Sequence, residues 1–138
     1  MNSKVLVAGI IGGIVAFLLG WLVYGILLMD FMAGQAGSAT GVSKEMPDML
    51  PLVLGNLFWG LAYAYIFGTW ANIKTFSGGA MGGAIVGGLF AAAFDLIMLG
   101  TTNIMTPTGA IVDVIASIVM SAVVGGVIGW WLGRGSAA

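Results

Sequence analysis

Two carboxylates lie inside stretches of the chain that are otherwise apolar. Asp95 interrupts "GGLFAAAFDLIMLG" (87–100) and Asp113 interrupts "AIVDVIASIVM" (110–120), and neither stretch contains a basic residue. A carboxylate held away from water must share a proton, accept a hydrogen bond from an uncharged side chain, or bind a cation. These two residues therefore offer a binding chemistry for a cation, a proton or a small cationic solute.

Three uncharged polar residues extend this candidate ligand-binding site. Tyr24 and Asn56 lie within other apolar stretches, and Asn103 follows the stretch that contains Asp95. Phenol and amide groups can donate hydrogen bonds to a carboxyl group. We predict that Tyr24, Asn56, Asp95 and Asp113 converge between helices. Asn103 and the two threonines before it are expected to close the site from the adjoining loop.

Other classes of chemistry lack their usual residues. The sequence contains no histidine, the usual acid/base group near neutral pH, and no cysteine. It has no phosphate-binding glycine loop and no nucleophile paired with a base, so we predict neither an enzyme nor a cofactor. The net charge is −1 with no basic cluster, which predicts no nucleic-acid partner. The identity of any metal at the carboxylates stays open.

The composition indicates which elements must position these residues. Hydrophobic residues make up 60% of the 138 residues and charged residues only 7%, against roughly 25% charged residues in an average soluble domain. So few charges cannot cover the surface of a water-soluble fold of this length. We therefore predict an integral membrane protein whose partner is the lipid bilayer.

The apolar residues fall into four stretches, each long enough for a membrane-spanning helix of about 20 residues. The predicted fold is all-α, a four-helix bundle forming a single membrane domain over residues 1–138. The first stretch exceeds the roughly 7–15-residue apolar core of a signal peptide, so we predict a retained helix. We leave the terminal "GSAA" (135–138) out of this assignment. The predicted helices are 5–29, 49–70, 78–100 and 110–133.

Capping residues and basic residues mark the ends of these helices. Asp48, Ser77 and "TPTG" (106–109) are candidate first-turn caps. Four spans place both termini on one side together with the basic residues at positions 4, 74 and 134, and leave only Lys44 on the other. The positive-inside rule then predicts cytoplasmic termini. The acids at positions 30, 45 and 48 fall in the outer loop, where we expect them to be solvated.

Glycine accounts for 24 residues, and small residues (glycine, alanine or serine) recur at every fourth position within each predicted helix. Residues four apart share a helix face, and small residues let membrane helices approach closely. Each such face also meets a polar residue toward the outer end of its helix, so we expect Asp95 to face other helices. The predicted packing glycines are Gly12, Gly20, Gly60, Gly83, Gly87, Gly125 and Gly129.

The chain resembles a group of small bacterial four-helix membrane proteins that is defined as a domain of unknown function. The residues that carry the resemblance are "GWLVYG" (20–25), the glycine-rich third span, and "AIVDVIASIVMSAVVGGVIGW" (110–130). The resemblance implies a four-helix bundle in a bacterial inner (plasma) membrane. It implies no activity.

Two functions from different classes remain open. The first is an accessory or structural membrane component that docks a partner membrane protein or forms a homo-oligomer. The alternative is a protein that binds a cation, a proton or a small cationic solute at Asp95 and Asp113, or lets it permeate, as a transporter would. Simpler interpretations also stand: Tyr24 as an interfacial aromatic, Asn56 as a bond between helices, and Asp113 as an acid favoured by the dipole of its first helical turn.

Overall fold

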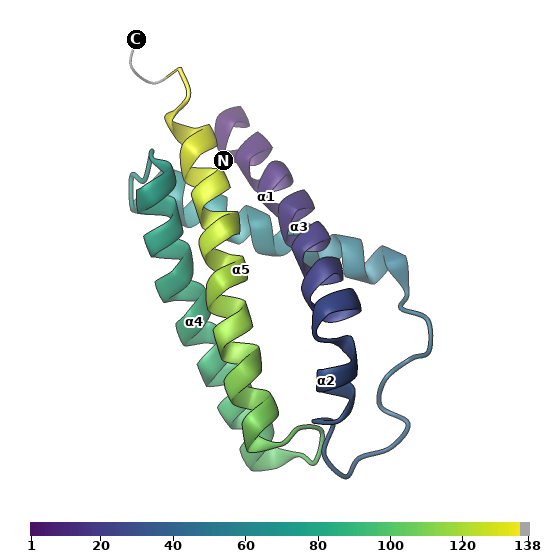
Figure 1. The fold of residues 1–138 in the computed structure, drawn as a ribbon. Helices are drawn as coiled ribbons and strands as arrows, with labels where there is room; N and C mark the ends of the chain where they lie inside the picture. Colours follow the sequence, from purple (N-terminus) through teal and green to yellow (C-terminus); the bar gives the residue numbers. More distant parts are fainter. Residues whose placement is uncertain (136–138) are drawn as a thin grey trace.

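Helices form most of the computed structural model, which describes residues 1–135 and has no strand among them (Figure 1). Four of the helices are long and apolar enough to cross a membrane, which confirms the predicted all-α class. Most of the terminal "GSAA", residues 136–138, lies outside the described residues. The helices are α1 (Ser3–Leu22), α2 (Met29–Ala33), α3 (Met49–Tyr65), α4 (Phe76–Thr101) and α5 (Pro107–Gly133).

Two π-helical turns extend the first two long helices. The turn η1 (Val23–Leu27) continues α1, and η2 (Ile66–Trp70) continues α3. With these turns the first two spans become Ser3–Leu27 and Met49–Trp70. Neither the π-turns nor the short helix α2 was expected from the sequence, because apolar periodicity does not distinguish a π-turn from an α-turn.

The helix ends show which capping predictions hold. Thr106 caps α5 by accepting from the backbone N–H three residues later, with Pro107 in the first turn, as its sequence predicts. For α4 the expected cap, Ser77, is wrong: the helix begins earlier and Thr75 is the cap. Asp48 precedes α3, but its carboxylate pairs with Lys44 and makes no capping hydrogen bond.

The long helices pack as two pairs. α4 lies along α5, α1 packs on α3, and contacts between α1 and α5 join the two pairs. Figure 1 shows α3 crossing behind α1 at a steep angle, whereas α4 and α5 run side by side. Over the described residues, the backbones of α3 and α4 hardly approach each other, although the side chain of Tyr63 on α3 reaches Gly87 on α4. Both described ends of the chain lie at the same end of the molecule.

Glycine backbones meet directly within both pairs. A Cβ atom on Gly79 or Gly83 of α4 would collide with the carbonyl groups of Gly125 or Ser121 on α5. A Cβ on Gly60 of α3 would collide with the backbone of α1. No side chain fits between backbones this close, so the paired helices depend on glycine there.

The other glycines of the predicted set lie at comparable positions, with one exception. Gly12 faces Ile128 across the α1–α5 contact, and Gly87 faces the hydroxyl group of Ser121. Gly129 lies against the backbone at the start of α4. Gly20 is only half-buried and has room for a side chain. Most of these glycine faces are therefore occupied by helices of the same chain.

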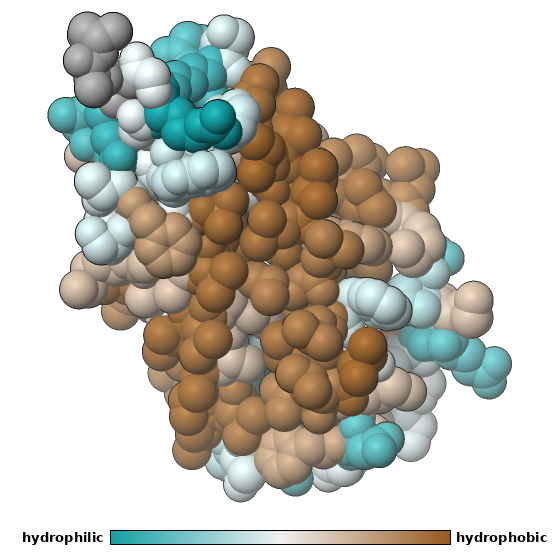
Figure 2. All heavy atoms as spheres, turned by 45° about the horizontal axis from the view of Figure 1, so that its top comes forward, coloured by the Kyte–Doolittle hydropathy of each residue, from teal (hydrophilic) through white to brown (hydrophobic). Residues whose placement is uncertain are grey.

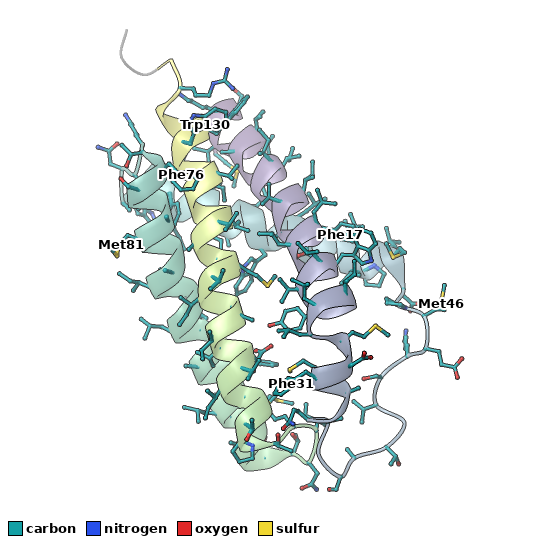
Figure 3. All side chains as sticks on the ribbon, in the orientation of Figure 1. Phe17, Phe31, Met46, Phe76, Met81 and Trp130 are labelled. Carbon is teal, nitrogen blue, oxygen red and sulfur yellow. The ribbon has the colours of Figure 1, made fainter. Side chains whose placement is uncertain are left out.

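The surface is apolar around the helices and polar at the ends of the molecule. Figure 2 shows a broad hydrophobic band, with hydrophilic residues at the end that carries the termini and over the loop between α2 and α3. Met81 points away from the bundle, and Met46 projects from that loop (Figure 3). A belt of apolar side chains between two polar ends is typical of a membrane-spanning bundle.

Candidate functional site

A cavity of about 570 Å³ lies between α1, α3, α4 and α5. Each of α4 and α5 contributes one helix face to its wall, because the residues involved recur at intervals of three or four. From α4 these include Ala91 and Asp95, and from α5 they include Asp113, Ser117 and Ser121. The cavity is in the size range of small-molecule binding sites.

Three of the residues predicted from the sequence come together in this cavity. Asp95 and Asp113 are close enough for their carboxyl groups to interact. The hydroxyl group of Tyr24 donates a hydrogen bond to Asp113 Oδ1 at 2.6 Å. Tyr24 reaches this position from η1, and π-turns are frequent at functional sites.

Asp95 is the most deeply enclosed of these polar groups. Its side chain is only 3% exposed. Its Oδ2 atom has no hydrogen-bond partner within residues 1–135. A buried carboxyl oxygen without a donor is costly, so this atom marks a place for a proton or a ligand.

The dipole of α5 does not explain why an acid is tolerated at position 113. The sequence placed this residue in the first turn of its helix, but α5 begins at Pro107, three residues earlier than expected. Asp113 therefore lies in the second turn, beyond the reach of most of the dipole effect. Tyr24 is the donor that the structure provides for this carboxylate instead.

Asn56 lines the same cavity from α3. Its Nδ2 atom donates to the carbonyl oxygen of Leu52, one turn earlier on the same helix, at 2.9 Å. The amide group thus belongs to the cavity wall but is engaged locally, away from the carboxyl pair. The expected hydrogen bond between Asn56 and another helix does not form.

Asn103 does not line the cavity over the described residues. It is exposed in the loop between α4 and α5, and its backbone oxygen accepts from Ala39 N at 2.9 Å. Thr101 and Thr102 donate to carbonyl groups one turn earlier on α4. The closure expected from these three residues is therefore not formed, and a segment of the α2–α3 loop covers this loop instead.

Two further features in and beside the cavity were missed. Tyr63, a core residue behind the lining, donates from its hydroxyl group to Ser121 Oγ at 3.2 Å, and Gly87 leaves room for this pair. Trp59 supplies an aromatic wall from α3. Ser117 and Ser121 follow Asp113 at four-residue spacing, so the sequence contained the signal for the serine positions, but nothing in it indicated Tyr63.

The donor set suits a single positive charge. Within the described part of the chain, no group of three His, Cys, Asp or Glu residues could hold a metal ion. Calcium requires six to eight oxygen ligands, and structural zinc prefers histidine and cysteine. One ionised carboxylate beside a protonated carboxyl group, with hydroxyl groups nearby, balances one monovalent cation or one ammonium group.

No family model, no curated protein and no solved structure matches this chain. The class of protein is therefore defined by its helices, four of which are long and apolar enough to cross a membrane. These helices are compatible with a small membrane protein. The resemblance to the bacterial four-helix family stays a prediction.

Proposed function

We propose that this protein binds a cation inside the membrane, at the cluster formed by Tyr24, Asp95 and Asp113. The observation that carries this proposal is the buried, unpartnered Oδ2 of Asp95 beside a second carboxyl group, at a cavity large enough for a ligand. This is the binding or permeation function that was the alternative from the sequence.

The charge balance of the cluster supports the proposal. Two carboxylates in a medium of low dielectric constant repel each other strongly, so the pair needs at least one positive charge, either as a proton on one carboxyl group or as a bound cation. The basic side chains lie elsewhere: Lys44 pairs with Asp48 in a loop, and the others are at the opposite end of the molecule. A proton or a bound cation therefore supplies the charge.

The accessory or structural role is our second proposal. It requires a free surface for a partner membrane protein or a second copy, and most packing glycines already face helices of this chain. What supports it is α3, where Leu50 and Phe58 project large apolar side chains outward. Neither proposal includes an enzymatic activity.

For localisation we propose a bacterial inner membrane with cytoplasmic termini. Lys4 donates to the carbonyl oxygen of Arg134, and Lys74 lines the same small pocket as Lys4. Arg134 also stacks on two tryptophan rings, at 5.0 and 4.8 Å from their centres. Basic and aromatic residues gathered at one end support a cytoplasmic interface there.

Thermal unfolding in detergent micelles tests the cation-binding proposal. We would compare the melting temperatures in lithium, sodium, potassium and tetramethylammonium chlorides for the parent, Asp95→Asn and Asp113→Asn. We expect at least one cation to raise the melting temperature of the parent and of neither variant. Asp30→Asn, in an exposed position, is the matched control and should respond as the parent does. An equal response in all four proteins would overturn the proposal.

A further inference from the structure

The cavity reaches the molecular surface between α3 and α4. On these two helices three aromatic lining residues are exposed: Trp59 by 46%, Phe90 by 61% and Phe94 by 62%. The lining residues from α1, η1 and α5 are buried or half-buried, with Ala16 4% and Val124 2% exposed. Because the backbones of α3 and α4 hardly approach each other and the exposed aromatic lining residues belong to these two helices, the opening lies along the seam between them.

The opening is bordered by spans rather than by loop residues. Its exposed lining residues are aromatic or apolar, and they belong to helices long enough to cross a membrane, from the first turn of α3 onward. At the loop end, Ala39 N donates to Asn103 O and Thr106 N donates to Gln35 O at 3.1 Å. These bonds hold the α2–α3 loop against the α4–α5 loop, so that end of the bundle is covered.

Two kinds of surface meet inside the cavity. One end carries the carboxyl pair with Tyr24, and the wall toward the seam carries Trp59, Phe90 and Phe94. A bare metal ion would use only the carboxyl end and leave most of the 570 Å³ empty. Aromatic rings attract ammonium groups and also cover apolar groups, so the whole wall suits a larger cation.

We propose that the ligand is an amphiphilic organic cation that enters from the lipid through the seam between α3 and α4. This rests on the proposed function, because it requires the carboxyl pair to bind positive charge. The ammonium group lies beside Asp95 and Asp113, and the apolar body lies against the three aromatic side chains. A ligand already dissolved in the membrane reaches this site without crossing a polar loop.

Calorimetric titration in lipid nanodiscs tests the ligand class, with empty nanodiscs as the blank. The probes are benzyltrimethylammonium and tetramethylammonium, which carry the same charge and differ by one aromatic ring. We expect the benzyl compound to bind at least tenfold more tightly to the parent. Asp95→Asn and Asp113→Asn should weaken both probes. Trp59→Leu combined with Phe94→Leu should remove only the preference for the benzyl compound.

Phe58→Leu is the matched control, because Phe58 is an exposed aromatic residue of α3 outside the cavity lining. It should leave both affinities unchanged. If the parent binds both probes with equal affinity and both Asn variants lose this binding, the inference is overturned and the proposed function stands. Binding of neither probe, or binding that survives both Asn substitutions, would overturn the inference. A parallel failure of the salt-dependent melting experiment would show that the proposed function fails as well.

Fluorescence tests the route of entry. In a variant with Phe at the other four tryptophan positions, Trp59 is the only tryptophan and reports on the seam. We expect lipids brominated on their acyl chains to quench its fluorescence, and benzyltrimethylammonium to reduce this quenching. Emission from Trp59 that brominated lipid does not affect would overturn entry from the lipid.

Discussion

Asp95 combines two properties that rarely occur together in one residue. It is almost completely enclosed, and its Oδ2 atom meets no donor among residues 1–135. An isolated acid at the bilayer centre costs about 2.5–3.5 kcal/mol on insertion scales. An amide or an apolar group at this place would avoid that cost, so we expect the acid to weaken the fold.

We expect Asp95→Asn to raise the melting temperature in the absence of added cations. The amide removes the repulsion between two carboxyl groups and provides an N–H donor beside Asp113. The gain should be about 1 kcal/mol in the free energy of unfolding, on the scale of one hydrogen bond. Thermal unfolding in cation-free detergent buffer measures it. A clear loss of stability would mean that the ionised carboxylate has a structural partner.

The hydroxyl group of Tyr24 should matter independently of its ring. Tyr24→Phe removes the 2.6 Å hydrogen bond to Asp113 and leaves that carboxyl group with one donor fewer. We expect a loss of about 1 kcal/mol in unfolding free energy, since hydrogen bonds inside membrane proteins are of this size. Tyr65→Phe is the control, because Tyr65 packs its ring on Trp70 at the other end of the bundle. Equal effects of the two substitutions would argue against a specific role for Tyr24.

At the scale of elements, the α4–α5 pair is the rigid side of the cavity. Its two backbones meet through Gly79, Gly83 and Gly125, which fixes the distance between the helices that carry Asp95 and Asp113. The α1–α3 pair is held in a similar way near Gly60. The two pairs share fewer contacts with each other than each has internally, so relative movement of the pairs would change the cavity.

Gly83→Ala should therefore separate α4 from α5. Its Cβ would collide with the carbonyl group of Ser121, and overpacking of this kind costs about 1–3 kcal/mol. Gly100→Ala is the matched control on the same helix, where a Cβ would meet no atom within 4 Å. We expect it to be neutral or slightly stabilising, because alanine favours a helix over glycine. Urea or thermal unfolding of both variants in micelles separates the two outcomes.

The sequence predicted the long helices well because an uninterrupted apolar stretch of about 20 residues has few other stable conformations in a membrane. It did not predict the π-turn at Tyr24 or the steep angle at which α3 crosses α1, since both depend on packing between helices. At the site, Asp95, Asp113 and Tyr24 were correctly expected to converge. Asn103 was misplaced because its loop pairs with the α2–α3 loop, a contact between segments that are far apart in sequence.

At the scale of the whole molecule, the distribution of charge predicts the orientation. Ser38 lies in the α2–α3 loop and Ser77 at the opposite end, and both are exposed. Because the chain has no cysteine, Ser38→Cys or Ser77→Cys creates a single reactive thiol. In intact cells, a membrane-impermeant maleimide should label the Ser38 variant, and the Ser77 variant only after permeabilisation. The reverse pattern would place the termini outside.

The opening that we propose between α3 and α4 has a consequence for the surrounding bilayer. A gap of this kind in a membrane does not stay empty, because acyl chains enter any apolar space that opens toward them. Lipid acyl chains would then compete with the proposed organic cation for the cavity, and they are present at a far higher concentration. The length and unsaturation of the acyl chains would therefore affect how much of the cation is bound. A detergent tail in the cavity would inhibit its binding.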